Sequence, residues 1–196
     1  MDDNLFTAAA SRSRIEPLAA EIRPPKLDEL IGQSHLLAPG TQLRKRIASG
    51  RIGSIILYGP PGVGKTTIAM AIGNEMGKAF EVLHPAHNNV ADIKRVTEKA
   101  REVPMLVFVD EVHRFNATQQ DHLLSLTEQG IFDFIGATTE NPFFALNKAL
   151  ISRSTIFQLK PLSVEEMEQV VRRAIRHMQT KNIYVQATPE TIKMIA

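Results

Sequence analysis

The chain has 196 residues, of which 43% are hydrophobic and 22% charged, and a net charge of +2, which is ordinary for a soluble globular protein of one full domain and part of a second. The absence of cysteine excludes disulfides, thiolate metal sites and cysteine nucleophiles, and it suits a reducing cytosol. Because no apolar run approaches the roughly 20 residues that span a bilayer, and the acidic amino terminus is unlike a signal peptide, we expect a cytoplasmic protein with no membrane partner.

The amino-terminal part of the chain precedes the first predicted strand. Residues 1–14 are small and polar, and they predict a mobile tail. Leu5-Phe6 is an apolar pair in this tail, and it either rests loosely on the domain or is a short motif for a partner. A lead-in segment follows, in which Pro24-Pro25 excludes a continuous helix. Residues 41–49 predict a helix with an apolar face.

The central motif of the chain is a phosphate-binding loop. Its residues fit the pattern G-x-x-x-x-G-K-[ST] at every defined position and are Gly59, Pro60, Pro61, Gly62, Val63, Gly64, Lys65 and Thr66. A buried strand at 54–58 precedes the loop, and a helix that begins with Thr67, also a predicted nucleotide contact, follows it.

In such a loop, backbone N–H groups form an anion-binding nest at the positive end of a helix. Lys65 is expected to reach the β- and γ-phosphates, and the Thr66 hydroxyl is expected to ligate Mg²⁺. The sequence therefore predicts a nucleotide site with a magnesium ion.

Strands and helices alternate through the rest of this region. Further strands are predicted at 80–84, 105–109, 131–136 and 155–159, and helices at 90–101, between Asn116 and Gly130, and at 143–150. Asn116 forms a capping box with Gln119 at the start of its helix. The run 105–109 is apolar throughout, as in a parallel strand that is buried on both faces. We therefore predict an α/β fold of the P-loop type, with a five-stranded parallel sheet flanked by helices.

The pattern changes after residue 161. Ser163 and Glu166 form a capping box for a helix with a broad apolar face, and Thr188-Pro189 marks another helix start. We expect a core at 15–161 and, at 162–196, the start of a helical lid domain that the chain does not complete. Such a chain is truncated or is an isolated fragment.

Two carboxylates, Asp110 and Glu111, follow the apolar strand at 105–109. In an open α/β sheet, the carboxyl ends of the strands line the ligand-binding edge. We expect Asp110 to hold Mg²⁺ through its hydration shell and Glu111 to act as the general base that polarises an attacking water. For an isolated Asp-Glu pair, the alternative is a solvated turn.

Two more polar residues are candidates for the reaction. Thr139 follows the next strand and is placed to hydrogen-bond the attacking water or the γ-phosphate, unless it serves only in a turn. Arg153 is a candidate to neutralise charge on the transferred phosphoryl group of a neighbouring subunit, as an arginine finger, unless it forms a surface ion pair. The histidines at 84, 87 and 113 lack metal-ligand spacing, so we expect them to be solvated or packed.

Several short motifs match the pattern of one family. They are Arg23-Pro24, Ile31-Gly32-Gln33, Gly59-Pro60-Pro61-Gly62, the run DEVHRFN at 110–116 and the run IGATTENP at 135–142. From about Ile15 to Leu162 the chain thereby resembles the AAA+ ATPases of the replication-associated recombination protein A (MgsA) family, whose eukaryotic relative is the Werner helicase-interacting ATPase.

The resemblance implies a role for each matching position. Residues 59–66 become Walker A, Asp110 and Glu111 become Walker B, Thr139 takes the sensor 1 place, and Arg153 takes the arginine-finger place. Four further residues fall where relatives line the adenine pocket, and they are Ile22, Arg23, Ile31 and Gly32.

The resemblance also implies cofactors and partners. It implies ATP with Mg²⁺, and ATP hydrolysis that depends on DNA forks and single-strand/double-strand junctions, in replication, recombination and repair near the nucleoid. Single-strand-binding protein and the sliding clamp are further expected partners, the clamp through Leu5-Phe6. Family members continue through a complete lid and an oligomerisation domain, so we expect a homo-oligomeric parent and, for this chain, weak association and low activity.

Two other functions stay open at this stage. One is a P-loop small-molecule kinase, although no arginine-rich lid is visible and Glu111 suits water activation better than a bulky acceptor. The other is a nucleotide-responsive binding module that shows no turnover in isolation. The net charge of +2 permits DNA as a partner without arguing for it, and no stripe of aromatic and basic residues marks a DNA surface.

Overall fold

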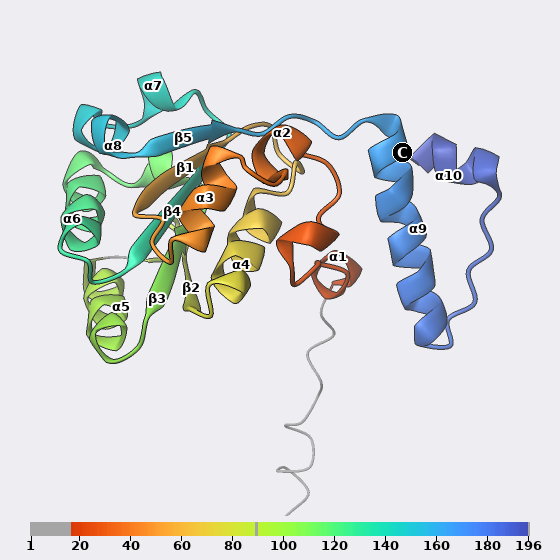
Figure 1. The fold of residues 1–196 in the computed structure, drawn as a ribbon, viewed down its shortest axis with the longest axis horizontal. Coiled ribbons are helices and arrows are strands. Elements are labelled where there is room, and N and C mark those ends of the chain that lie inside the picture. Colours follow the sequence, from red (N-terminus) through yellow and green to blue (C-terminus); the bar gives the residue numbers. More distant parts are fainter. Residues whose placement is uncertain (1–16, 89, 196) are drawn as a thin grey trace, which may run out of the picture.

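A five-stranded parallel sheet forms the centre of the protein (Figure 1). The structure is a computed structural model that describes residues 17–88 and 90–195, so the predicted tail with Leu5-Phe6 lies outside the described residues. The strands are β1 (Ser54–Tyr58), β2 (Ala79–Leu83), β3 (Met105–Val109), β4 (Asp133–Thr138) and β5 (Thr155–Gln158). Their order is β2-β3-β4-β1-β5, and every pairing is parallel, which confirms the predicted fold.

Helices cover both faces of the sheet because successive strand residues point to opposite sides. Ile55 and Leu57 of β1 belong to one apolar cluster, and Ile56 between them belongs to a second cluster. The first cluster packs against α2 (Ser34–Leu37), α3 (Gln42–Ala48) and α4 (Lys65–Glu75). The second packs against α5 (Val90–Glu102), α6 (Ala117–Glu128) and α8 (Lys148–Arg153).

Strand β4 begins two residues later than the sequence pattern predicts. The Ile131 N–H donates to the carbonyl of Leu126 at 3.1 Å, so residue 131 completes the end of α6 instead of starting the strand. The strand starts at Asp133, whose carboxylate accepts hydrogen bonds from the N–H groups of Ile52 (3.1 Å) and Gly53 (2.8 Å). These bonds align the start of β4 with the start of β1.

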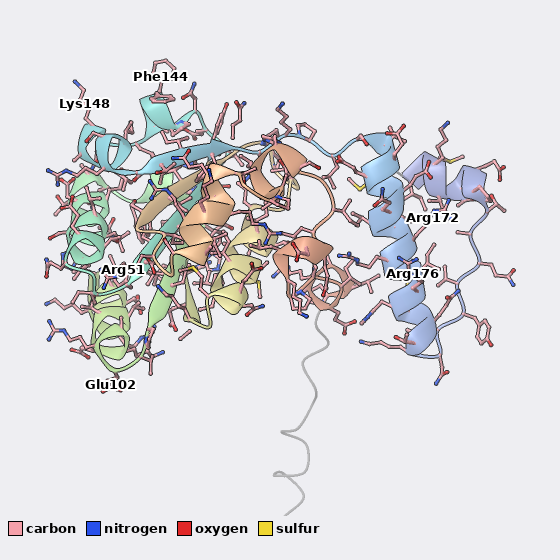
Figure 2. The ribbon with its side chains drawn as sticks, viewed as in Figure 1. Arg51, Glu102, Phe144, Lys148, Arg172 and Arg176 are labelled. Atoms are coloured by element: carbon pink, nitrogen blue, oxygen red, sulfur yellow. The ribbon has the colours of Figure 1, made fainter. Side chains whose placement is uncertain are left out.

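The predicted helix at 143–150 is wrong, because the chain forms two short helices, α7 (Pro142–Ala145) and α8. Asn147 lies between them and caps α8 by accepting a hydrogen bond from the Leu150 N–H at 2.7 Å. Its own N–H donates to Gln120 of α6 at 3.0 Å. These two hydrogen bonds of Asn147, one to α8 and one to α6, compete with those that a continuous helix would form at this position. Figure 2 shows Phe144 and Lys148, from the two helices, projecting outward.

The segment after the sheet forms α9 (Val164–Thr180) and α10 (Pro189–Ile195), and both predicted capping boxes, Asn116–Gln119 and Ser163–Glu166, are present. Helix α9 lies beside α1 (Leu18–Glu21) rather than on the sheet (Figure 1). The Glu21 carboxylate contacts Lys181 at 2.5 Å and His177 at 3.0 Å. These hydrogen bonds lower the pKa of the Glu21 carboxyl group, and the bond from Lys181 contributes most.

Two one-turn 3-10 helices, η1 (Leu27–Glu29) and η2 (Val112–Arg114), complete the described elements. The lead-in segment also holds the connection between β5 and α9. The Gln33 side chain, 5% exposed, donates to the Lys160 carbonyl at 2.6 Å and accepts from the Lys160 N–H at 3.0 Å. Within the described ranges, no helix combines the length and the apolar character needed to cross a membrane.

We expect Asp133→Ala to lower the free energy of unfolding by about 3–5 kcal/mol, because it leaves a buried charge without its partner. Asp133 pairs with Lys78, and the two side chains are 9% and 14% exposed. The measurement is urea unfolding monitored by circular dichroism. Asp28→Ala is the matched control, because Asp28 also pairs with a cation, Arg44, but is 84% exposed. Equal losses in the two variants would show that Asp133 does not fix the register of β4.

Candidate active site

The phosphate-binding loop leaves the sheet at the carboxyl end of β1 and leads into α4. Gly62 and Gly64 have φ angles of +80° and +93°, which residues other than glycine adopt only with strain. A Cβ atom at Gly59 would lie 2.7 Å from the backbone oxygen of Leu159, so the loop passes β5 too closely for any side chain. Helix α4 begins at Lys65, two residues earlier than predicted, and its first N–H groups therefore face the loop.

Lys65 lies inside the loop and is 7% exposed. Its ammonium group donates to the carbonyls of Gly59 and Pro60, both at 2.8 Å. Burial lowers the pKa of Lys65, and the carboxylates of Glu111 and Asp110 act in the opposite direction. The two acids from the end of β3 are therefore close enough to Lys65 to influence its charge.

Asp110 and Glu111 reach the loop's edge of the sheet because β3, β4 and β1 are parallel neighbours. The Asp110 N–H donates to the Leu83 carbonyl of β2 at 3.2 Å, which extends the ladder by one residue. Glu111 then turns the chain with φ +55°, a left-handed conformation that costs a residue with a side chain of order 1–3 kcal/mol. Such strain persists only where surrounding structure imposes it, and here it turns the chain into η2.

Thr139 lies directly beside Glu111. Strand β4 is the neighbour of β1, and Thr139 follows its last residue. The Thr139 hydroxyl donates to Oε2 of Glu111 at 3.2 Å. The structure therefore brings together Lys65, Glu111 and Thr139, three of the four residues that the sequence suggests for catalysis.

Arg153 is the fourth, and the structure does not bring it to this chain's own loop. It ends α8, just before β5, and the neighbouring Ser154 hydroxyl lies 2.6 Å from that of Ser54, the first residue of β1. The loop follows the last residue of β1, about 16 Å away along a strand that rises about 3.3 Å per residue. Arg153 is 57% exposed and contacts Glu128 at 3.1 Å.

His113 is a neighbour of Glu111 that sequence reasoning assigned only to packing or solvent. Its Nδ1 lies 3.3 Å from Oε2 of Glu111 and 2.9 Å from the hydroxyl of Thr138. Its Nε2 lies 3.3 Å from Oε1 of Glu140. The sequence signal that could have placed His113 in the site is its position two residues after Glu111. The single turn of η2 brings the His113 side chain back over the end of β4.

A cavity of about 200 Å³ adjoins the loop. Ile22, Arg23 and Ile31, which the family pattern assigns to the adenine pocket, line this cavity, whereas Gly32 is not among its lining residues. A Cβ at Gly32 would lie 2.3 Å from the side chain of Leu162. The loop contributes residues 62–64 and Thr67. Helix α9 contributes residues that the sequence did not assign to this site, although its apolar face was visible in the pattern, and they are Met167, Val170 and Arg173.

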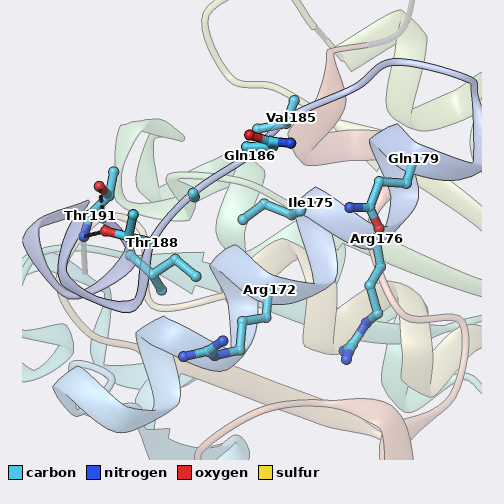
Figure 3. Close-up of a pocket in the computed structure, with 10 residues that line it drawn as sticks. Arg172, Ile175, Arg176, Gln179, Val185, Gln186, Thr188 and Thr191 are labelled. Carbon is cyan, nitrogen blue, oxygen red and sulfur yellow. Dashed lines mark hydrogen bonds between the residues drawn. The ribbon is translucent and has the colours of Figure 1, made fainter.

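A second groove, of about 730 Å³, lies between α9 and the segment that leads into α10 (Figure 3). Its walls carry Arg172 and Arg176 from α9 and Gln186 and Thr188 from the opposite segment. It is larger and more open than the cavity beside the loop, but none of its lining residues belongs to the loop or to the acidic edge of the sheet. The candidate active site is therefore the smaller cavity together with the loop and that edge.

We expect Gly59→Ala to weaken nucleotide binding by tenfold or more, because the added methyl group must push the loop away from the Leu159 carbonyl. Binding is measured by the fluorescence of a labelled adenine nucleotide. Gly40→Ala is the control outside the loop, since no atom lies within 4 Å of the added Cβ and the only strain comes from the backbone, at φ +86°. Equal affinity in the two variants would contradict a rigid role for the close approach at Gly59.

Comparisons with known proteins agree with this geometry. Residues 22–156 match the family described as the Holliday junction DNA helicase RuvB P-loop domain. Replication-associated recombination protein A of Escherichia coli (strain K12) is 46% identical over 170 residues, which cover 84% of this chain and 38% of that protein. An uncharacterised AAA domain-containing protein of Mycobacterium tuberculosis is 44% identical over 184 residues, which cover 91% and 41%.

A solved structure of the Thermotoga maritima RuvB Holliday junction branch migration motor has a TM-score of 0.71 and 29% identity, over 89% of this chain and 59% of that one. The chain spans about two fifths of the length of the two curated relatives. The match to the RuvB P-loop domain over most of the chain, together with the parallel sheet and its phosphate-binding loop, shows the family. The chain belongs to the AAA+ P-loop ATPases of the replication-associated recombination protein A family.

Proposed function

We propose that this chain binds ATP with Mg²⁺ at the carboxyl edge of its sheet and hydrolyses it, as the nucleotide module of a protein that acts on DNA. The observation that carries the proposal is the convergence of Lys65, Glu111 and Thr139 from three adjacent strand ends. A phosphate-binding cation, a carboxylate base and a hydroxyl that holds this base are the groups that hydrolysis of a phosphoanhydride requires.

The loop is suited to hold the phosphates. Lys65 now donates to two loop carbonyls, and these are bonds that it can exchange for bonds to phosphate oxygens within the same hollow. The amino terminus of α4, an 11-residue helix, adds N–H groups and the positive end of its dipole. We assign residues 59–67 to phosphate binding on this basis.

Thr66 and Asp110 would hold the magnesium ion. Mg²⁺ in phosphate sites takes one or two protein oxygens and completes its shell with phosphates and water. The donor set fits this preference, because it consists of one hydroxyl and one carboxylate, both of which are oxygen ligands. When bound, the ion neutralises charge on the phosphate oxygens.

Glu111 is assigned as the general base. It takes a proton from water while the water oxygen forms a bond to the γ-phosphorus, and the bond to the bridging oxygen breaks to leave ADP and phosphate. The Thr139 hydroxyl holds the carboxylate at 3.2 Å. Arg153 is exposed and remote from this chain's own loop, so we assign it to the nucleotide of a neighbouring copy, where it would offset charge on the transferred group.

The cavity beside the loop is suited to the adenine ring. Most of its lining side chains are apolar, among them Ile22 and Ile31 from the lead-in segment and Val170 from α9. A flat aromatic base gains from burial against such walls. We therefore propose that 162–196 is the start of a lid, because α9 closes one side of this cavity.

DNA is the proposed partner. The support is the similarity of the chain to replication-associated recombination protein A and to the RuvB branch migration motor. By the same family relation, we propose forks and single-strand/double-strand junctions as the DNA structures, homo-oligomers of the longer protein as the assembly, and single-strand-binding protein and the sliding clamp as further partners. The proposed location is the cytoplasm, at the nucleoid.

We expect Glu111→Gln to keep nucleotide affinity within about twofold and to lower the rate of phosphate release by about 10²–10⁴-fold, the usual contribution of a general base. Lys65→Ala should instead weaken binding about 10- to 100-fold, as expected for the loss of bonds from a charged donor. Glu98→Gln, an exposed change on α5, is the control. Affinity comes from nucleotide fluorescence and rate from a phosphate-release assay.

Three results would redirect the proposal. Normal turnover in Glu111→Gln would remove the base assignment. Transfer of labelled phosphate to an acceptor other than water would indicate a kinase. Tight binding without phosphate release by the unchanged chain would indicate a nucleotide-responsive binding module.

We also expect the chain with a non-hydrolysable ATP analogue to bind a labelled DNA fork more tightly than a blunt duplex of equal length. Affinity for both should fall as salt rises, because contacts to phosphates release counterions. Fluorescence anisotropy measures this at two salt concentrations. Equal affinity for fork and duplex would contradict junction recognition by this module.

A further inference from the structure

We propose that His113 is a positioning residue for Glu111, and that it couples the direction of the Glu111 carboxylate to the exposed carboxylate of Glu140. This inference rests on the proposed function, because it assigns to Glu111 the role of base. Sequence reasoning placed neither His113 nor Glu140 in the site.

The His113 ring lies between two carboxylates. The side chain is 12% exposed, and each ring nitrogen faces a carboxylate, Glu111 at 3.3 Å from Nδ1 and Glu140 at 3.3 Å from Nε2. The Thr138 hydroxyl lies 2.9 Å from Nδ1. A rigid ring between two carboxylates transmits a rotation from one to the other, because both nitrogens are fixed to one plane.

The partners of the ring come from two different segments. Glu111 follows β3 and precedes η2, whereas Thr138 and Glu140 belong to the end of β4 and the turn that follows it. Glu111 and Glu140 lie 29 residues apart in the sequence, and the ring is the group that lies between their side chains. The ring therefore ties the base to the strand that also supplies Thr139.

Oε2 of Glu111 accepts a hydrogen bond from the Thr139 hydroxyl at 3.2 Å, and Nδ1 of His113 lies 3.3 Å from the same oxygen. One donated hydrogen bond and the adjacent ring, both at the same oxygen, restrict the rotation of the carboxylate and leave its other oxygen, Oε1, for water. Glu140 is 61% exposed, so its contact with the ring is open to change from outside the site.

The first experiment measures hydrolysis by the whole chain in His113→Ala, His113→Asn and, as matched control, His122→Ala, which changes an exposed histidine on α6. We expect His113→Ala to lower kcat about five- to twentyfold with KM within twofold, because the base is misplaced while the binding loop is intact. His113→Asn should recover most of the rate, since its amide group can replace Nδ1. Failure of asparagine to rescue, or a loss confined to KM, would overturn the proposal.

The second experiment does not depend on turnover, so it separates failure of this inference from failure of the proposed function. The carboxyl ¹³C resonance of Glu111 is followed by NMR in Glu140→Gln, with and without His113→Ala. We expect Glu140→Gln to shift the Glu111 resonance when the ring is present and to leave it unchanged when the ring is absent. A shift that persists without the ring, or that is missing in both backgrounds, would overturn the coupling even in a chain that hydrolyses ATP.

Discussion

The parallel register of three strands decides which polar side chains can meet in this protein. Val109, the last residue of β3, pairs with Gly136, so β4 continues two residues further, to Thr138. Tyr58, the last residue of β1, pairs with that same Thr138. The phosphate loop, Glu111 and Thr139 therefore start from one level of the sheet, and a slip of one residue would reverse the side on which each side chain emerges.

The opposite edge of the sheet fixes this register. Asp133 binds two N–H groups just before β1 and also pairs with Lys78, which follows α4. A buried carboxylate with three partners tolerates little displacement, because each lost partner leaves an unpaired polar group. Strained or desolvated groups at the other end, such as Glu111 at φ +55° and the buried Lys65, depend on that rigidity.

The sequence predicted those parts whose cause is local. The loop pattern, the apolar run of β3 and the capping boxes each lie within a few residues, so spacing alone identifies them. The contacts that sequence reasoning missed join distant residues. Gln33 binds Lys160, His113 joins Glu111 to Glu140, and Asn147 reaches α6, which splits a helix that local preference would continue. None of these contacts has a periodicity, because each depends on where the fold places two segments.

The cavity beside the loop joins two parts of the structure that are otherwise connected mainly by polar contacts. Its walls come from the loop, the lead-in segment and α9, yet α9 is held by Glu21, by Gln33 acting on Lys160, and by a hydrogen bond of 2.5 Å from Arg173 to the Glu29 carbonyl. No residue of α9 is fully buried. An adenine ring in the cavity would make apolar contacts with α9 and with the loop and lead-in segment at once. Occupancy of the cavity and the position of α9 are therefore linked, because a ligand that touches both walls stabilises the arrangement in which they are close.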